Sequence, residues 1–319
     1  MWDMEGPPST TASSPMSNLA TAFDKAQTIA QQADRLGYDT FWMAEHHFQP
    51  EGYECLPNIL LLDVHLAHLT ERIKLGCAFN ITPMWHPLRL AEDFATADIL
   101  TGGRVVFKAF NQQSFSHHGK YYDIPPRVPY RGGTPRALDF MAKHGIKGTI
   151  GGGVAVGGAM DSVVVGYRDA LVRAGREDVE LGEDLSIGFH FYLADTQEKA
   201  IREAARYFEE HLKMFGPLRL TRGLNEQQIR DISEPKLAPY AGLPTLEGAV
   251  KAVAFLCGPP EQIIESFKKV EDRYPGLERV NVSHPVGTPQ KVILEQLEWF
   301  AQEVMPAFKG RVGPSVPAD

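Results

Sequence analysis

The stretch Gly37-Tyr-Asp-Thr-Phe-Trp-Met-Ala-Glu-His-His-Phe-Gln-Pro-Glu51 decides the fold class of this chain. Before it, apolar residues recur at helical spacing over Asn18–Leu36, and Gly37 ends that helix in the usual C-terminal position. The run Asp39–Ala44 then predicts a short buried strand, which is followed directly by Glu45-His46-His47. Parallel strands of α/β proteins carry their active-site loops at their carboxyl ends. This group of ionisable residues is therefore the first site candidate.

The same alternation of helix and strand continues along the chain, with short loops that favour a parallel sheet. The strands predicted are Asp39–Ala44, Ile73–Thr82, Arg104–Phe110, Lys147–Gly152, Leu185–Ala194 and Arg279–His284. The helices predicted are Asn18–Leu36, Pro57–Thr70, Leu88–Leu100, Thr134–His144, Met160–Ala174, Thr196–Phe215, Pro260–Val270 and Pro289–Phe308. We expect an N-terminal loop over residues 1–17, one domain over 18–310 with a helical insertion at about 217–258, and a flexible tail over 311–319.

The composition limits the classes of partner. The net charge is −8, from 40 acidic and 32 basic residues without a clustered basic stripe, so nucleic acid is not expected to bind. The three cysteines, Cys55, Cys77 and Cys257, are far apart and form no Cys-x-x-Cys pair, which indicates reduced thiols in a cytoplasmic protein. The chain shows neither a signal peptide pattern nor an apolar run of 18 residues, so neither export nor membrane spanning is indicated.

Five sequence runs resemble the bacterial luciferase-like flavin monooxygenases, and they occur in the family's order between residues 18 and 308. They are Leu36-Gly-Tyr-Asp-Thr-Phe-Trp-Met-Ala-Glu-His-His-Phe, Pro83-Met-Trp-His-Pro-Leu-Arg-Leu-Ala-Glu-Asp, Leu100-Thr-Gly-Gly-Arg-Val, Phe115-Ser-His-His-Gly-Lys-Tyr-Tyr and Gly287-Thr-Pro-Gln with Glu303-Val-Met-Pro-Ala-Phe. The resemblance implies a TIM (β/α)8 barrel of the luciferase-like type. Segments corresponding to strands 1 and 5 and to the loop after strand 4 are missing from this sequence.

Two explanations of the missing segments stay open: the sequence omits stretches of a longer parent, or the barrel is shortened. Omission is favoured because a barrel that lacks two strands exposes unpaired sheet edges, which proteins usually avoid.

The resemblance also implies an activity. It predicts an FMN-dependent monooxygenase that uses reduced FMN and O2 to oxygenate a small organic substrate through a flavin C4a-(hydro)peroxide. A single barrel leaves no room for a nicotinamide domain, so a separate flavin reductase is the expected partner, and a homodimer or higher homo-oligomer is the expected assembly. A deazaflavin is the less favoured cofactor.

The resemblance selects His46 as the residue beside the flavin ring, where it acts as base or proton donor. Imidazole suits this role because its ordinary pKa, about 6.5, lies near working pH. The alternative interpretation is a structural histidine pair whose hydrogen bonds are satisfied. Glu45 either orients His46 or is a buried, paired carboxylate. His86 either reaches the substrate pocket or fixes the loop before Pro87.

The cofactor-binding residues expected from the resemblance form three groups. Ala78, Phe79 and Asn80 lie under the flavin ring, where the family commonly has a non-prolyl cis peptide, here Ala78–Phe79. Thr134 contacts the flavin phosphate at a helix N-terminus, a place that attracts anions, although an N-cap role alone is compatible with the same residue. The Gly-rich residues Gly151, Gly152 and Gly153 let the backbone approach the cofactor closely.

Two rival functions stay open. A non-catalytic flavin-binding protein of the same fold is one. A metal-dependent barrel hydrolase is the other, and its ligands would be His46, His47, His117 and His118, which have no His-x-x-x-His helical spacing. We expect no metal.

Overall fold

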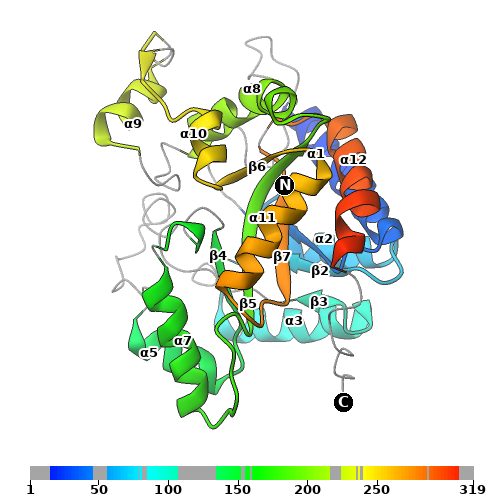
Figure 1. Ribbon diagram of the computed structural model, residues 1–319. Helices are drawn as coiled ribbons and strands as arrows, with labels where there is room; N and C mark the ends of the chain where they lie inside the picture. Colours follow the sequence, from blue (N-terminus) through cyan, green and yellow to red (C-terminus); the bar gives the residue numbers. More distant parts are fainter. Residues whose placement is uncertain are drawn as a thin grey trace. The chain divides into compact units, whose positions relative to one another are not determined.

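We describe the chain from a computed structural model (Figure 1). The structure describes residues 15–45, 56–78, 80, 85–106, 134–151, 155–158, 160–215, 224–234, 236–237, 240–285 and 287–308. The chain divides into two compact units: residues 1–127, 209–240 and 286–301 form the first, and residues 128–208, 241–285 and 302–319 form the second. Each unit is described by itself.

The first unit contains a three-stranded parallel sheet. Its strands are β1 (Thr40–Met43), β2 (Lys74–Cys77) and β3 (Val105–Val106), in the order β1-β2-β3. Its helices are α1 (Pro15–Leu36), α2 (Ile59–Ala67), α3 (Pro87–Thr101), α9 (Glu226–Ser233) and α12 (Gln290–Trp299). A π-helical turn over Phe300–Val304 follows α12, and its first two residues are the last of this unit.

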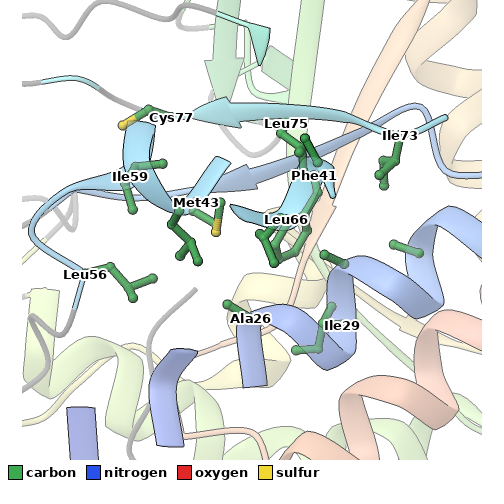
Figure 2. Close-up of a cluster of buried hydrophobic side chains, with 14 of the residues drawn as sticks. Ala26, Ile29, Phe41, Met43, Leu56, Ile59, Leu66, Ile73, Leu75 and Cys77 are labelled. Atoms are coloured by element: carbon green, nitrogen blue, oxygen red, sulfur yellow. The ribbon is translucent and has the colours of Figure 1, made fainter. Parts of the chain in front are cut away.

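The core of this unit lies between the sheet and its helices. Phe41, Met43, Leu75 and Cys77 alternate with residues of the other face, and they pack against apolar side chains of α1 and α2 such as Ala26 (Figure 2). Ile293 and Leu297 of α12 belong to the same cluster. Because successive strand residues point to opposite faces, this packing leaves the other face of the sheet to Trp42 and Gly76.

The second unit is built around its longest strand, β5 (Leu185–Leu193). Strands β4 (Gly148–Gly151), β6 (Phe255–Gly258) and β7 (Arg279–Ser283) all pair with β5 in parallel. The helices of this unit are α5 (Pro135–Lys143), α7 (Asp161–Arg173), α10 (Leu246–Lys251) and α11 (Pro260–Arg273), with α8 (Gln197–Phe215) running from this unit into the first and a 3-10 turn over Met305–Ala307.

The architecture confirms the mixed α/β class with parallel sheets, and a strand occurs within each of the six predicted ranges. Strand β6 corrects the prediction of a helical insertion over 217–258, because its four buried residues lie inside that range. Phe-Leu-Cys-Gly is short and apolar throughout, so it carries no alternation that marks a strand. Helix α1 begins at Pro15, within the predicted N-terminal loop. The single domain over 18–310 stays a prediction.

Two further observations concern membrane-spanning helices and the cysteines. Among the residues that the structure describes, no helix combines the length and apolar composition needed to cross a bilayer. Cys77 and Cys257 are both buried free thiols, as expected for reduced cysteines.

Val253 follows α10 with a backbone φ of 53°, a left-handed conformation that a β-branched residue rarely adopts. The turn is held by the amide of Ala254, which donates to the carbonyl oxygen of Ala249 over 2.8 Å. We expect Val253→Gly to raise the free energy of unfolding by about 1 kcal/mol, because glycine occupies this conformation without strain. Urea denaturation checks this, with Val172→Gly on the exposed face of α7 as the destabilising control; an unchanged or lower midpoint for Val253→Gly contradicts the prediction.

Candidate active site

The carboxyl end of the first sheet is shaped by a tryptophan that covers a glycine. Trp42 and Gly76 are register partners on β1 and β2. A β-carbon at position 76 would come within 2.5 Å of Trp42 Cζ3 and 3.0 Å of the Val106 carbonyl oxygen. Only glycine fits there, because the Trp42 ring covers this position on the face opposite that of Phe41 and Met43.

Glu45 follows β1 and is buried, with 4% of its surface exposed. Its charge raises the pKa of the Cys77 thiol, after burial itself, and its backbone hydrogen-bonds with that thiol. Since Cys77 belongs to the apolar cluster on the helix side of the sheet, Glu45 lies beside that layer. This position fits the buried-carboxylate reading that the sequence left open.

Asp63 is a second buried carboxyl group of this unit, and no sequence motif marks it as a site residue. It lies on α2 with 0% exposure, and neither carboxyl oxygen has a hydrogen-bond partner among the described residues. Burial holds its pKa well above the ordinary value of 3.8. A single acidic residue inside Ile-Leu-Leu-Leu-Asp-Val was the sequence signal that could have identified it.

The segment after β2 carries the residues expected beneath a flavin ring. The amide of Ala78 donates to the Met43 carbonyl oxygen over 2.6 Å, which extends the pairing of β1 and β2 by one residue. Asn80 is fully buried, and its carboxamide oxygen and nitrogen both lack hydrogen-bond partners within the described part of the chain. Phe79 lies outside the described residues. A buried carboxamide without partners calls for an explanation, and a bound ligand is one.

The structure describes only one of the histidines that the sequence selects as site candidates. His46 and His47 lie outside the described ranges, as do His117 and His118 of the metal alternative. His86 is exposed at the N-cap position of α3, before Pro87, and its side chain makes no capping hydrogen bond. Among the residues that are described, no group of three or more His, Cys, Asp or Glu side chains is arranged to hold a metal.

The phosphate candidates belong to the second unit. Thr134 is the N-cap of α5, where its hydroxyl oxygen accepts from the amide of Ala137 at 3.4 Å. The N-cap role is therefore confirmed, while phosphate contact stays a prediction. Gly151 is the exposed last residue of β4, whereas Gly152 and Gly153 are not among the described residues.

One face of the second sheet is polar. The hydroxyl groups of Thr149 and Ser186 lie 2.8 Å apart, and the Asn281 amide donates to Ser186 over 3.2 Å. Further along β5, His190 Nδ1 lies 2.9 Å from the hydroxyl oxygen of Ser283 on β7. Burial lowers the pKa of His190 to about 4, so this imidazole is neutral at physiological pH. Sequence patterns alone did not distinguish this face.

Comparison with known proteins shows which proteins this chain resembles. Residues 6–109 match the family model described as luciferase-like monooxygenase. The oxygenase component of a flavin-dependent trigonelline monooxygenase from Acinetobacter baylyi is 22% identical over 334 residues, covering 90% of this chain and 90% of that protein. Limonene 1,2-monooxygenase from Rhodococcus erythropolis is 23% identical over 341 residues, which cover 90% of this chain and 81% of that protein. An uncharacterised Sinorhizobium fredii protein is 28% identical over 127 residues, which span 36% of its length.

Solved structures show the same fold. The oxygenating constituent of 3,6-diketocamphane monooxygenase from Pseudomonas putida, in complex with FMN, superposes with a TM-score of 0.66 at 17% identity and covers 95% of this chain and 96% of that chain. The coenzyme F420 dependent tetrahydromethanopterin reductase from Methanopyrus kandleri superposes with a TM-score of 0.65 at 16% identity. It covers 90% of this chain and 96% of that chain. The fold is thus of the luciferase-like type. The chain is a relative of the luciferase-like monooxygenases, which confirms the resemblance found in its sequence.

Proposed function

We propose that this chain is the oxygenase of a two-component, FMN-dependent monooxygenase that acts on a small organic substrate. The observation that carries the proposal is Asn80, a fully buried carboxamide without partners among the described residues, at the carboxyl end of the first sheet. It lies inside the segment that matches the luciferase-like family, residues 6–109. The names of the relatives that span most of the chain support the reaction class.

The residues present fit a flavin. The Asn80 carboxamide would offer one hydrogen-bond acceptor and one donor group to a polar ligand such as a flavin. Thr134, with the free amides at the start of α5, is a suitable phosphate contact, and Gly151 leaves room for close backbone approach. A deazaflavin also carries polar groups on its ring, so Asn80 does not discriminate between the two cofactors. FMN is favoured because the relatives that cover 90% of the chain are named as monooxygenases and one of them as flavin-dependent.

The flavin, when bound, supplies the activation of oxygen, and the protein manages protons and excludes water. We assign proton handling to His46. Glu45 lies beside the helix-facing layer, and side chains alternate along an extended chain, which supports His46 as the residue on the pocket face. His86, exposed before α3, is the candidate for contact with substrate. The name "oxygenase component" of one relative supports a separate reductase partner.

We further propose that the two sheets are parts of one (β/α)8 barrel whose first and fifth strands are missing from this sequence. Support for a common fold of the two sheets comes from the solved structures of similar proteins, each of which is covered to 96%; the two missing strands rest on the sequence resemblance. The test is the intact mass of the protein purified from its source. A mass well above 35.4 kDa is expected, and a mass of 35.4 kDa excludes the omission of internal segments.

Anaerobic titration with FMN and with photoreduced FMN tests the proposed function, followed by exposure to oxygen with a panel of small N-heterocyclic and terpene substrates. We expect tighter binding of the reduced cofactor and substrate-dependent oxygen uptake that yields a hydroxylated or epoxidised product. Binding without product identifies the non-catalytic flavin protein instead. Absence of binding in either redox state, with Asn80→Ala and native protein indistinguishable, overturns the proposal.

The expected homo-oligomer has support on α3. Leu88, Ala91, Ala95 and Ile99 follow helical spacing and are all exposed, Ile99 by 80%. An exposed apolar stripe of this kind marks an interaction surface. We expect Ile99→Asp to convert a dimer to a monomer in size-exclusion chromatography with light scattering. Val172→Asp, at an exposed apolar residue of α7, is the matched control and keeps the native mass; a native protein that is already monomeric contradicts the prediction.

A further inference from the structure

A buried tyrosine at the end of α11 holds the segment that follows β4 in the second unit. Tyr274 is 1% exposed, and its hydroxyl oxygen lies 2.8 Å from the carbonyl oxygen of Ala155 and 3.0 Å from Asp161 Oδ1. The single hydroxyl proton is therefore shared between two acceptors. These acceptors precede Tyr274 by 119 and 113 residues, so the contact is set by the tertiary structure.

Arg273 completes a group of three side chains, Asp161, Arg273 and Tyr274, which we call the Tyr274 clamp. The Arg273 guanidinium donates to Asp161 Oδ2 over 2.6 Å, so both carboxylate oxygens of Asp161 accept from the end of α11. Gly158 has a φ of 75°, and a β-carbon there would lie 2.8 Å from Arg273 Nη2. Glycine at this turn is what lets the guanidinium approach. The ion pair is half-exposed and contributes little alone, so the buried hydroxyl is the central part of the clamp.

The clamped segment contains two consecutive turns. The amide of Gly158 donates to the carbonyl oxygen of Ala155 over 3.1 Å, and the amide of Asp161 donates to the carbonyl oxygen of Gly158 over 3.2 Å. The end of α11 is itself fixed, because the amide of Gly182 donates to the carbonyl oxygen of Pro275 over 2.6 Å. The clamp therefore joins the turns before α7 to an anchored part of the unit.

A second buried tyrosine makes a comparable contact at the other end of β4. Tyr167 of α7 is 3% exposed, and its hydroxyl group donates to the carbonyl oxygen of Ile146 over 2.8 Å. Ile146 precedes β4, whereas Ala155 follows it. Ligands of parallel α/β sheets bind beyond the carboxyl ends of the strands. Of these two tyrosines, Tyr274 therefore holds the segment on the side where a ligand is expected.

We propose that Tyr274 is a positioning residue for the cofactor: through Ala155 and Asp161 it holds the turns after β4 in the conformation in which the strand end at Gly151 receives the flavin. The part about the cofactor rests on the proposed function. A site whose backbone is fixed before binding loses less conformational entropy when the ligand binds. Loosening these turns therefore weakens affinity, although the Tyr274 hydroxyl acts through the backbone and not by touching the cofactor.

Amide hydrogen exchange of the flavin-free protein, followed by NMR, tests the clamp itself. Tyr274→Phe keeps the buried ring and removes only the hydroxyl group, and Tyr167→Phe is the matched control. We expect both variants to lower the melting temperature by about 2–4 °C. The amides of Gly158 and Asp161 should exchange about tenfold faster in Tyr274→Phe and at native rates in Tyr167→Phe. Native exchange rates of these amides in Tyr274→Phe overturn the clamp.

Anaerobic titration with reduced FMN tests the cofactor role. We expect Tyr274→Phe, Asp161→Ala and the double variant each to weaken the affinity about tenfold, because residues that act as one unit are not additive, and Tyr167→Phe to stay within about twofold of native. Equal affinities of Tyr274→Phe and Tyr167→Phe overturn the positioning role, and a loss of about a hundredfold in the double variant overturns the single unit. If the native protein binds no flavin, the proposed function fails and the cofactor role with it, while the exchange rates still decide the clamp.

Discussion

Replacing His46 with alanine is expected to lower flavin-dependent turnover by about 10²–10⁴-fold, the range typical for loss of a general acid or base. Reduced FMN should still bind within about threefold of the native affinity, because a proton-transfer role contributes to the chemical step rather than to binding. Stopped-flow spectrophotometry separates cofactor binding from the chemical step, because reduced FMN is bound before oxygen is admitted.

The neighbouring histidine is the matched control for that experiment. His47→Ala removes the same side chain one position further along, where it is expected on the other face of the chain. Native turnover in His47→Ala together with a large loss in His46→Ala supports the assignment. Equal losses in the two variants indicate a structural histidine pair, and unchanged turnover in His46→Ala removes that residue from the mechanism. His46→Gln should lose the imidazole-dependent limb of the pH–rate profile.

Asp34→Ala is expected to have the largest effect on stability, lowering the free energy of unfolding by about 3 kcal/mol or more. The Asp34 carboxylate accepts from the amides of Glu71, Arg72 and Ile73 over 2.7, 3.0 and 2.8 Å. It thus ties the end of α1 to the turn that leads into β2. Without the carboxylate, these amides, including the buried amide of Ile73, lose their acceptor, and an unmade buried hydrogen bond costs more than a formed one contributes.

The pH dependence of Asp34 provides a check with a defined sign. Burial pulls its pKa upward, but the three backbone amides and the Arg72 charge outweigh burial, so the folded pKa lies below the ordinary 3.8. The contribution of Asp34 to the free energy of unfolding is therefore complete above pH 3.8, and it is lost as pH falls through the folded pKa. Urea denaturation should show the native and Asp34→Ala midpoints converging in that acidic window.

Asp24→Ala, at an exposed position of the same helix, is the control for Asp34 and should change the unfolding free energy by no more than about 0.5 kcal/mol. A midpoint for Asp34→Ala equal to that of Asp24→Ala contradicts the role given to the three hydrogen bonds.

Much of the fold could be predicted because local patterns and tertiary packing agree. Helix α1 has a 3.6-residue apolar period and ends at Gly37, whose φ of 81° suits glycine. Strand β5 alternates buried and half-buried residues along most of its length. Strand β6 was missed because its four residues are all buried, and a uniformly apolar tetrapeptide has no period from which its conformation can be identified.

The candidate site was predictable only at the level of residue type. Adjacent ionisable residues after a strand, and the family resemblance around them, directed attention to the end of β1. No pattern indicated that Asn80 and Asp63 would both be buried without hydrogen-bond partners among the described residues, because burial depends on which side chains meet from separate elements.

By itself, therefore, the sequence determined the order of helices and strands, the parallel α/β class and the luciferase-like kinship, since these follow from periodicity and from motifs that lie within single segments. Only the tertiary structure decided which polar groups are buried away from water and which of these form hydrogen bonds. Burial and hydrogen bonding are set by contacts between residues far apart in the chain, such as Asp34 with the turn at Glu71–Ile73 and Tyr274 with Ala155.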